Sequence, residues 1–174
     1  MKLGVHARSI IVLTVICLVW GGLLAAVHDF TRESIERAEN AEINAALSII
    51  FPGGQFTSEN GYYGCTENGA LVGYAIISKG KGYGGEMKVI VGVGLDNRVA
   101  GVYVLSHSET TGIGSRATEN AFLGQFTGKT LDNLQLKKNG GEIDAVTGAT
   151  ISSNAVTNAV HDGIQILIEG IGGT

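Results

Sequence analysis

The residues best suited to chemistry form one stretch near the carboxyl end, Asp144 to Ser153. It reads Asp-Ala-Val-Thr-Gly-Ala-Thr-Ile-Ser-Ser, with one acid, four hydroxyl groups and a small Gly148-Ala149 pair. The stretch leads into a predicted helix over 152–168, for which Ser152 or Ser153 is the expected N-cap. The apolar residues of that helix recur at the spacing of one face: Ala155, Val156, Ala159, Val160, Gly163, Ile164 and Leu167.

Two interpretations of this stretch are open. It could be only a capped helix after a tight turn, in which the hydroxyls and the acid satisfy backbone amides. The same unpaired amides and the positive end of the helix dipole would also bind a phosphate group. In that case Gly148 and Ala149 would let a bulky ligand approach the backbone, and a hydroxyl could carry the phosphate covalently.

Two glycine motifs resemble a dinucleotide-binding fingerprint. Gly80 to Gly85 matches G-x-G-x-x-G, and Gly112 to Ala117 matches its G-x-G-x-x-A form. That fingerprint needs a tight turn from a strand into a helix within a βαβ unit. The first motif runs into a strand, which predicts a β-turn. The second opens a helix that leads into a polar loop, so neither motif indicates a dinucleotide-binding fold.

The apolar segment from Ser9 to Val27 has 19 residues and no ionisable group except the thiol of Cys17. This length crosses a bilayer as a helix. A cleaved signal peptide is the alternative, but the run exceeds the usual apolar length and no Ala-x-Ala follows it. We therefore expect a tail at 1–8, a transmembrane helix at 9–28 and a linker helix at 29–52. Lys2 and Arg8 before the segment favour a cytoplasmic amino terminus, with the body outside.

Composition excludes several other classes of protein. Apolar residues make up 44% of the chain, and its 27 glycines show no Gly-x-y period, so neither a disordered nor a collagen-like chain is indicated. Cys17 and Cys65 are too few for a disulfide framework or a cysteine-built zinc site. Residues 29–174 keep all 16 acidic residues but only 10 of the 12 basic ones, which argues against a nucleic-acid partner. Cys65 is expected to be a buried or unreactive thiol.

The body, 53–174, reads as an α+β domain. Alternating apolar residues predict strands at 70–78, 86–93 and 99–105, with Asp96-Asn97 as the turn between the last two. We interpret 54–69 as a turn region, 115–126 as a short amphipathic helix and 128–142 as a polar loop. Strands grouped between helices predict an antiparallel sheet covered by helices and preceded by one transmembrane helix.

These residues carry a resemblance to a known family. Asp144, Thr147, Gly148, Ala149 and Thr150 fit D-x-x-[ST]-G-A-T. This resembles the flavinylation motif of the FMN-binding domain in the G subunit of Rnf-type ion-translocating electron transport complexes and in the C subunit of Na+-translocating NADH:quinone reductase. The loop from 109 to 114 is similar to the family's E-T-P-G-L-G, with threonine at position 111 in place of proline. The short chain looks more like the G subunit of the Rnf-type complexes.

The resemblance implies an FMN joined through its phosphate to the hydroxyl of Thr150 and installed from FAD by a separate flavin transferase. It also implies that the 109–114 loop contacts the isoalloxazine. Tyr83 could stack on the ring, although an aromatic residue that enters a strand is more often part of the core. Asp144 would orient the threonine or meet the transferase's metal, or would simply satisfy turn amides. The expected cofactor-binding residues are Tyr83, Gly84, Glu109, Thr110, Thr111, Gly112, Asp144, Thr147, Gly148, Ala149, Thr150, Ser152 and Ser153.

The implied function is that of a membrane-anchored flavoprotein relaying electrons in an Rnf-type complex of a prokaryotic cell membrane. It would be an electron carrier within the complex rather than a stand-alone enzyme, with no catalytic residue or metal ligand of its own. Its partners would be the other membrane subunits of the complex, the flavin transferase and the lipid bilayer. Two alternatives stay open: the C subunit of a Na+-translocating NADH:quinone reductase, and a non-redox, membrane-tethered module that binds a phosphorylated ligand.

Overall fold

The computed structural model describes residues 4–59 and 61–171. Its first element is α1 (Val5–Ile50), one continuous helix that covers both the predicted apolar segment 9–28 and most of the predicted linker helix 29–52. The chain divides into two compact units, of which the first ends at Ala41 and the second begins at Glu42. The last turns of α1 therefore belong to the folded domain.

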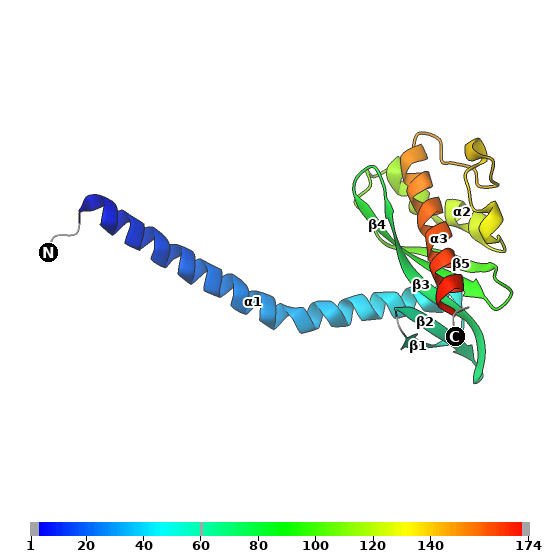
Figure 1. The fold of residues 1–174 in the computed structure, drawn as a ribbon, viewed down its shortest axis with the longest axis horizontal. Coiled ribbons are helices and arrows are strands. Elements are labelled where there is room, and N and C mark those ends of the chain that lie inside the picture. Colours follow the sequence, from blue (N-terminus) through cyan, green and yellow to red (C-terminus); the bar gives the residue numbers. More distant parts are fainter. Residues whose placement is uncertain (1–3, 60, 172–174) are drawn as a thin grey trace. The chain divides into compact units, whose positions relative to one another are not determined.

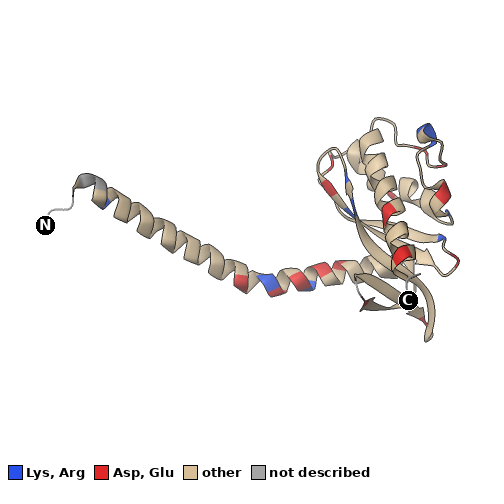
Figure 2. Ribbon diagram, in the orientation of Figure 1, with Lys and Arg blue, Asp and Glu red and all other residues tan. Residues whose placement is uncertain are grey.

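The first unit is an apolar helix followed by charged turns. Among the helices that the structure describes, α1 alone is long and apolar enough to cross a membrane. Figure 2 shows its uncharged stretch giving way to turns rich in acidic and basic residues. There Arg32 pairs with Glu36 at 2.8 Å and Arg37 pairs with Glu33 at 2.5 Å. These i,i+4 pairs support the helix where its apolar side chains become sparse.

The second unit is built on a five-stranded antiparallel sheet. Its strands are β1 (Gln55–Glu59), β2 (Tyr62–Glu67), β3 (Ala70–Lys81), β4 (Glu86–Gly94) and β5 (Val99–Ser106), paired in chain order. The three predicted strands are confirmed as β3, β4 and β5. The predicted α+β class, an antiparallel sheet covered by helices and preceded by an apolar helix, is confirmed as well.

The predicted turn region at 54–69 is wrong, because it contains the hairpin of β1 and β2. Asn68 (φ 52°) and Gly69 (φ 81°) join β2 to β3. Positive φ at both central residues is the requirement of a type I′ hairpin turn, which Asn-Gly meets at low cost. The predicted turn at Asp96-Asn97 is confirmed, and Asn97 also has a positive φ of 60°.

Two hydrophobic clusters lie on opposite faces of the sheet. Successive β4 residues alternate between them: Val89 and Val91 join the cluster that includes α3, whereas Ile90 joins the one formed with the end of α1. On the α1 side, a Cβ at Gly92 would lie 2.4 Å from Cγ2 of Ile50, so only glycine allows this close approach. The residues of α1 buried in this cluster are Ile43, Ala46, Leu47 and Ile50.

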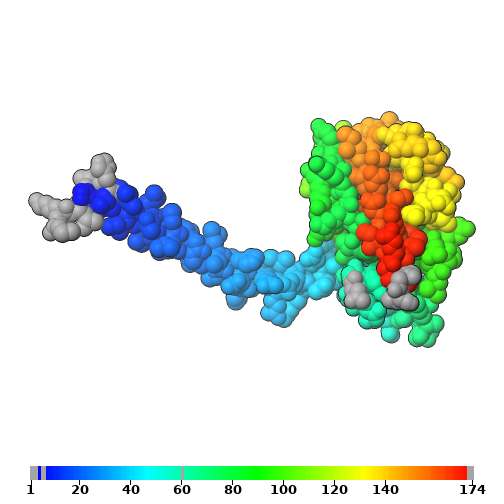
Figure 3. All heavy atoms as spheres, in the orientation of Figure 1, coloured from blue at the N-terminus to red at the C-terminus, as the bar shows by residue number. Residues whose placement is uncertain are grey.

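Helix α3 (Thr150–Ile171) covers the other face of the sheet (Figure 1). All seven residues predicted for its apolar face are buried, which confirms the spacing argument. The helix lies close to β3, because a Cβ at Gly80 would be 2.3 Å from the carbonyl oxygen of Ala155. Figure 3 shows the segment coloured yellow packed beside α3, which is orange to red.

The stretch 114–139, whose later part is yellow in Figure 3, is not the continuous helix predicted at 115–126. It forms η1 (Gly114–Thr118), α2 (Asn120–Leu123), η2 (Gly124–Phe126), η3 (Leu131–Asn133) and η4 (Lys137–Asn139). Glu119 is extended, with ψ of 151°, and this separates η1 from α2. Just before it, the hydroxyl of Thr118 bonds to the carbonyl of Ser115 at 2.7 Å, a local bond that competes with helix continuation.

Candidate functional site

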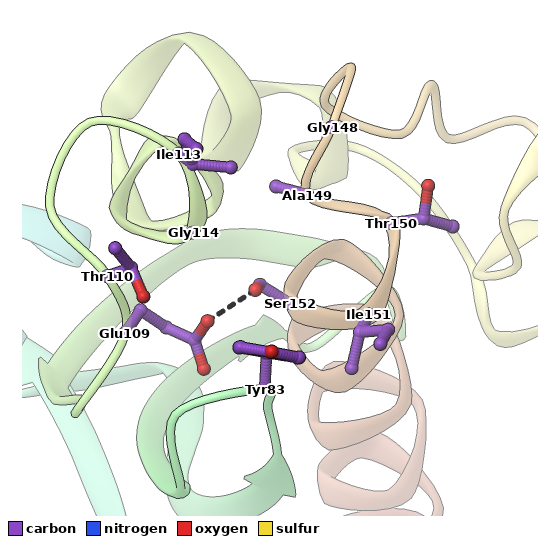
Figure 4. A pocket seen from close by; sticks show the side chains of 10 residues that line it. All are labelled: Tyr83, Glu109, Thr110, Ile113, Gly114, Gly148, Ala149, Thr150, Ile151 and Ser152. Atoms are coloured by element: carbon purple, nitrogen blue, oxygen red, sulfur yellow. Dashed lines mark hydrogen bonds between the residues drawn. The ribbon is translucent and has the colours of Figure 1, made fainter.

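A cleft of about 400 Å³ lies where three segments meet: the β3–β4 turn, the loop after β5 and the start of α3. We call it the central cleft. Its volume lies within the range of small-molecule sites, about 300 to 1,000 Å³. Figure 4 shows the residues that line it: Tyr83, Glu109, Thr110, Ile113, Gly114, Gly148, Ala149, Thr150, Ile151 and Ser152.

Glu109 ties the three segments together. Its side chain comes from the loop after β5 and is 7% exposed. Oε1 accepts a hydrogen bond from the backbone N–H of Gly84 in the β3–β4 turn at 3.0 Å. Oε2 accepts one from the hydroxyl of Ser152 in α3 at 2.5 Å (Figure 4). Hydrogen bonds to a charged group are the stronger ones, so this carboxylate fixes the walls of the cleft relative to one another.

Glycines make room for this buried carboxylate. A Cβ at Gly82 would lie 2.0 Å from Oε1 of Glu109, and one at Gly114 would lie 2.4 Å from Oε2. A Cβ at Gly84 would lie 1.9 Å from the carbonyl oxygen of Ser108. The β3–β4 turn is also closed by the N–H of Gly82 bonding to the carbonyl of Gly85 at 2.8 Å. The first glycine motif is therefore the turn between β3 and β4, as predicted, and Gly82 is the glycine that leaves room for the Glu109 carboxylate.

Helix α3 begins at Thr150, two residues earlier than predicted, so neither Ser152 nor Ser153 is its N-cap. Gly148, with φ of 81°, turns the chain into the helix. Ser153 is fully buried in the first turn, where its hydroxyl donates to the carbonyl of Ala149 and accepts from the N–H of Val146. Both serines are therefore buried in the first turn, where their hydrogen bonds hold the preceding turn and the start of α3 in place.

The hydroxyl of Thr150 differs from those of other helical threonines. Thr14, Thr31 and Thr157 each donate to the carbonyl four residues earlier, at 2.7 to 2.9 Å. Within the described chain, the Thr150 hydroxyl makes no hydrogen bond, and its residue is exposed at the edge of the central cleft. Figure 4 shows its side chain pointing away from Glu109. It is a hydroxyl that is accessible to a reagent and not already engaged.

Three large apolar side chains of the central cleft are exposed. Tyr83 is 75% exposed, and Ile113 and Ile151 are each 56% exposed. Exposed apolar groups around a cleft favour a flat, partly apolar ligand. The sequence prediction included Tyr83 but missed both isoleucines. For Ile113 the available signal was an apolar residue between two glycines. For Ile151 it was an apolar residue directly after the motif threonine.

The structure brings seven predicted site residues to the central cleft: Tyr83, Glu109, Thr110, Gly148, Ala149, Thr150 and Ser152. Gly84 and Ser153 support its walls through the hydrogen bonds given above. Thr111 and Gly112 do not line it. Gly112 has φ of 84°, nothing lies within 4 Å of a Cβ built there, and its N–H bonds to the hydroxyl of Ser115. Its glycine is therefore required by a turn.

Asp144 and Thr147 line a separate depression beside α2. The carboxylate of Asp144 pairs with Nζ of Lys137 at 2.6 Å. Its backbone N–H and carbonyl both bond to the side-chain amide of Gln125, at 2.8 and 3.2 Å. This pairing anchors the segment before the motif turn to the helical pieces of 114–139.

FMN fits these residues. The central cleft has the volume of a cofactor site, apolar groups of suitable size and an unengaged hydroxyl at its edge. Gly148 and Ala149 present little side chain beside that hydroxyl: a Cβ at Gly148 would meet only Cγ2 of Ile113, at 3.8 Å. The backbone at the start of α3 is therefore open to a phosphate group.

The residues that line the central cleft all lie within a region that matches a known protein family. The model of the FMN-binding domain family matches residues 82–165. The G subunit of the proton-translocating ferredoxin:NAD(+) oxidoreductase complex of Clostridium ljungdahlii is 32% identical over 168 residues, covering 92% of this chain and 91% of the relative. The G subunit of the ion-translocating oxidoreductase complex of Methanosarcina acetivorans is 31% identical over 173 residues, covering 91% and 92%.

Two solved structures share the fold. NqrC of Shewanella oneidensis is similar with a TM-score of 0.54 and 26% identity, over 65% of this chain and 61% of that one. The C subunit of the Na(+)-translocating NADH-quinone reductase of Parabacteroides distasonis has a TM-score of 0.52 and 20% identity, over 61% and 60%. Either match spans less than two thirds of the solved chain. Together with the two relatives above, the comparisons show that the chain belongs to the FMN-binding domain family that includes the G subunit of ion-translocating oxidoreductase complexes.

Proposed function

We propose that this chain carries FMN joined through its phosphate to Thr150, and that it relays electrons as a subunit of a membrane-bound ion-translocating oxidoreductase complex. The complex is suggested by the relatives, which are named as G subunits of such complexes. The cofactor is suggested by the FMN-binding domain match over residues 82–165. When bound, FMN supplies the redox chemistry, since it can accept electrons and pass them on.

One observation carries the attachment site: the exposed hydroxyl of Thr150, which has no partner among the residues described and lies at the edge of the central cleft. Thr147 also has an exposed hydroxyl, but it lies in the depression beside α2. Ser152 and Ser153 are buried and engaged in hydrogen bonds. Of the four hydroxyls in the motif, Thr150 is therefore the one that combines access with the cleft.

In the attachment reaction, a separate transferase would move the FMN half of FAD to Thr150 and release AMP. A bond forms between Oγ of Thr150 and the phosphorus of the FMN half. The bond from that phosphorus to the bridging oxygen of AMP breaks, and the hydroxyl proton is released. The resulting phosphodiester keeps one negative charge at the amino terminus of α3, where the helix dipole favours an anion.

The other residues of the central cleft would hold the ring. Tyr83, Ile113 and Ile151 offer apolar surface that a flat ring can cover, which removes that surface from water. Glu109 has both carboxylate oxygens occupied by Gly84 and Ser152, so its role is to keep the cleft walls in place. Thr110, which is exposed at the cleft, is the hydroxyl most available to the ring on this loop.

The chain is a single-pass membrane protein, as indicated by its apolar α1 and its relatives in ion-translocating complexes. We place its amino terminus in the cytoplasm and the domain outside, on the weak excess of basic residues before the apolar segment. A covalent tether suits that location, because a carrier that lost its cofactor there would have no cytoplasmic flavin pool to replace it.

Denaturing electrophoresis tests covalent attachment. The full chain, coexpressed with a flavin transferase, should give a yellow fluorescent band that survives denaturation. Loss of all colour on denaturation would instead indicate noncovalent binding of a phosphorylated ligand, and would contradict the proposed tether. Thr147→Ala is a matched control, since it removes an exposed motif hydroxyl outside the central cleft and should keep the band.

A further inference from the structure

A second pocket, of about 330 Å³, shares the lining residues Thr150 and Ile151 with the central cleft. We call it the lysine pocket. Three segments that are distant in sequence form it: the end of β3, the η4 turn and the first turns of α3. It is lined by Lys79, Gly80, Lys81, Lys138, Thr150, Ile151, Asn154, Ala155, Asn158 and Asp162.

Two lysines of this pocket have unengaged ammonium groups. Lys79 pairs with Glu86 at 3.1 Å, but the side chains of Lys81 and Lys138 have no hydrogen bond or ion pair with any residue that the structure describes. They come from different elements, β3 and η4, in a body whose acidic residues outnumber its basic ones. Figure 2 shows basic segments in both of these regions.

The acid in the lysine pocket does not neutralise these two cations directly. Asp162 has its carboxylate 3.3 Å from Nδ1 of His161, its neighbour in α3. The side chains of Asn154 and Asn158 add amide groups one and two turns into the helix. Two free ammonium groups, amides and a helix amino terminus make a set of donors suited to an anion.

Thr150 and Ile151 line both pockets, so the two pockets adjoin at these residues. Their chemistry differs. The central cleft has exposed apolar groups and the buried carboxylate of Glu109, which would repel a phosphate. The lysine pocket has the free cations. A ligand with an apolar ring and a phosphate would therefore place its ring in the first and its phosphate toward the second.

We propose that the lysine pocket is a phosphate subsite, in which Lys81 and Lys138 bind the phosphoryl group of a flavin nucleotide positioned at Thr150. This inference rests on the proposed function, and it assigns the phosphate end of the ligand to residues outside the D-x-x-[ST]-G-A-T motif. The lysines act before attachment by holding the phosphate beside the hydroxyl, and afterwards by pairing with the phosphodiester. Exposed ion pairs of this kind contribute modestly, so two of them give roughly a threefold to tenfold preference for a phosphorylated ligand.

The test compares FMN with riboflavin, which has the same ring and no phosphate. Full chain made without transferase is titrated with each flavin in detergent, and quenching of flavin fluorescence gives the two dissociation constants. The ratio of the riboflavin to the FMN dissociation constant measures the contribution of the phosphate to binding. In the Lys81→Gln/Lys138→Gln double variant that ratio should fall roughly threefold to tenfold, toward one. Lys129→Gln is the control for loss of a lysine charge elsewhere in the domain, because Lys129 pairs with Glu142 outside the pocket, and it should leave the ratio unchanged.

A second measurement covers the case of weak flavin binding. The rate of flavin attachment to the purified chain, at limiting FAD and transferase, is followed by intact mass for the same variants. The double variant should be slower than wild type and the Lys129 control should not. The proposal would be overturned if the ratio of the riboflavin to the FMN dissociation constant were the same in wild type, the double variant and the Lys129 control. It would also be overturned if binding were too weak to measure and the three chains were flavinylated at equal rates. Absence of any flavin on wild-type Thr150 would refute the proposed function instead. The ratio of the riboflavin to the FMN dissociation constant would still show whether the lysine pocket binds the phosphate.

Discussion

Removing the hydrogen bond between Glu109 and Ser152 should lower the free energy of unfolding of the domain by about 1.5 to 3 kcal/mol. Oε2 of Glu109 and Oγ of Ser152 are 2.5 Å apart, and the two residues are 7% and 2% exposed. Buried hydrogen bonds to a charged group contribute about 1.5 to 3 kcal/mol net. Glu109→Ala would also leave the Gly84 amide without its acceptor, so we expect this variant to lose about 3 kcal/mol or more.

A double-mutant cycle isolates the pair. Glu109→Ala, Ser152→Ala and the double variant should give a coupling energy of about 1.5 to 3 kcal/mol, because the second substitution removes a partner already lost. Such losses are smaller than a typical domain stability of about 5 to 15 kcal/mol, so the variants should still fold. The exposed pair of Lys129 and Glu142 supplies a control cycle, with an expected coupling of about 0.2 to 1 kcal/mol.

The assay is urea unfolding of the full chain in detergent, followed by tyrosine fluorescence. Tyr62 and Tyr74 are suitable reporters, since their rings pack edge to face in the domain with centroids 5.7 Å apart. Hydrogen exchange of the Gly84 amide gives a local check, and it should speed up in Glu109→Ala. If the stability losses of the two single variants add up to that of the double variant within about 0.3 kcal/mol, Glu109 and Ser152 are not coupled, because independent sites behave in that way.

Three further predictions follow from particular residues. Gly114→Ala should lose about 3 kcal/mol in the same urea titration, since its Cβ would lie 2.4 Å from Oε2 of Glu109, whereas Gly112→Ala should lose only about 1 to 2 kcal/mol for its positive φ. Equal losses would show that Gly114 does not crowd the carboxylate. Cys65 is fully buried, and burial raises the pKa of its thiol to about 11, so labelling of the folded chain at about pH 8 should be slow and should rise as pH approaches that value. Fast labelling before unfolding would contradict this. A reporter fused to the carboxyl end should be active only if it is of a kind that works outside the cytoplasm, and activity of a cytoplasmic reporter would reverse the proposed orientation.

Periodic segments of the fold could be predicted from sequence, whereas the exposed hairpin of β1 and β2 could not. The apolar face of α3 and the strands β3 to β5 have clear periods, because each buries one face or both against a helix. The hairpin of β1 and β2 was missed because β1 is mostly exposed and so lacks a buried face to enforce a pattern. Asn68-Gly69 was the available signal, since that dipeptide favours a hairpin turn.

Site residues that belong to one local motif could be predicted from the sequence. Those that come together only through tertiary packing could not. Thr150, Gly148 and Ala149 are close together in sequence, so one motif indicated all three. Glu109 was expected to face the ring, but its partners Gly84 and Ser152 come from other segments and could be identified only in the fold. The lysine pocket has the same origin: Lys81 and Lys138 are 57 positions apart in the chain and meet only through β3, η4 and α3.

Fragment mass spectrometry of the full chain, made with and without a flavin transferase, tests the central claim most directly. We expect one FMN group, added with loss of water, on the peptide that contains the motif, with fragmentation placing it on Thr150. Thr150→Ala should abolish it and Thr147→Ala should retain it, both in folded chains with unchanged urea midpoints. Undiminished flavin on the Thr150→Ala variant, or its location on Thr147, would contradict attachment at Thr150.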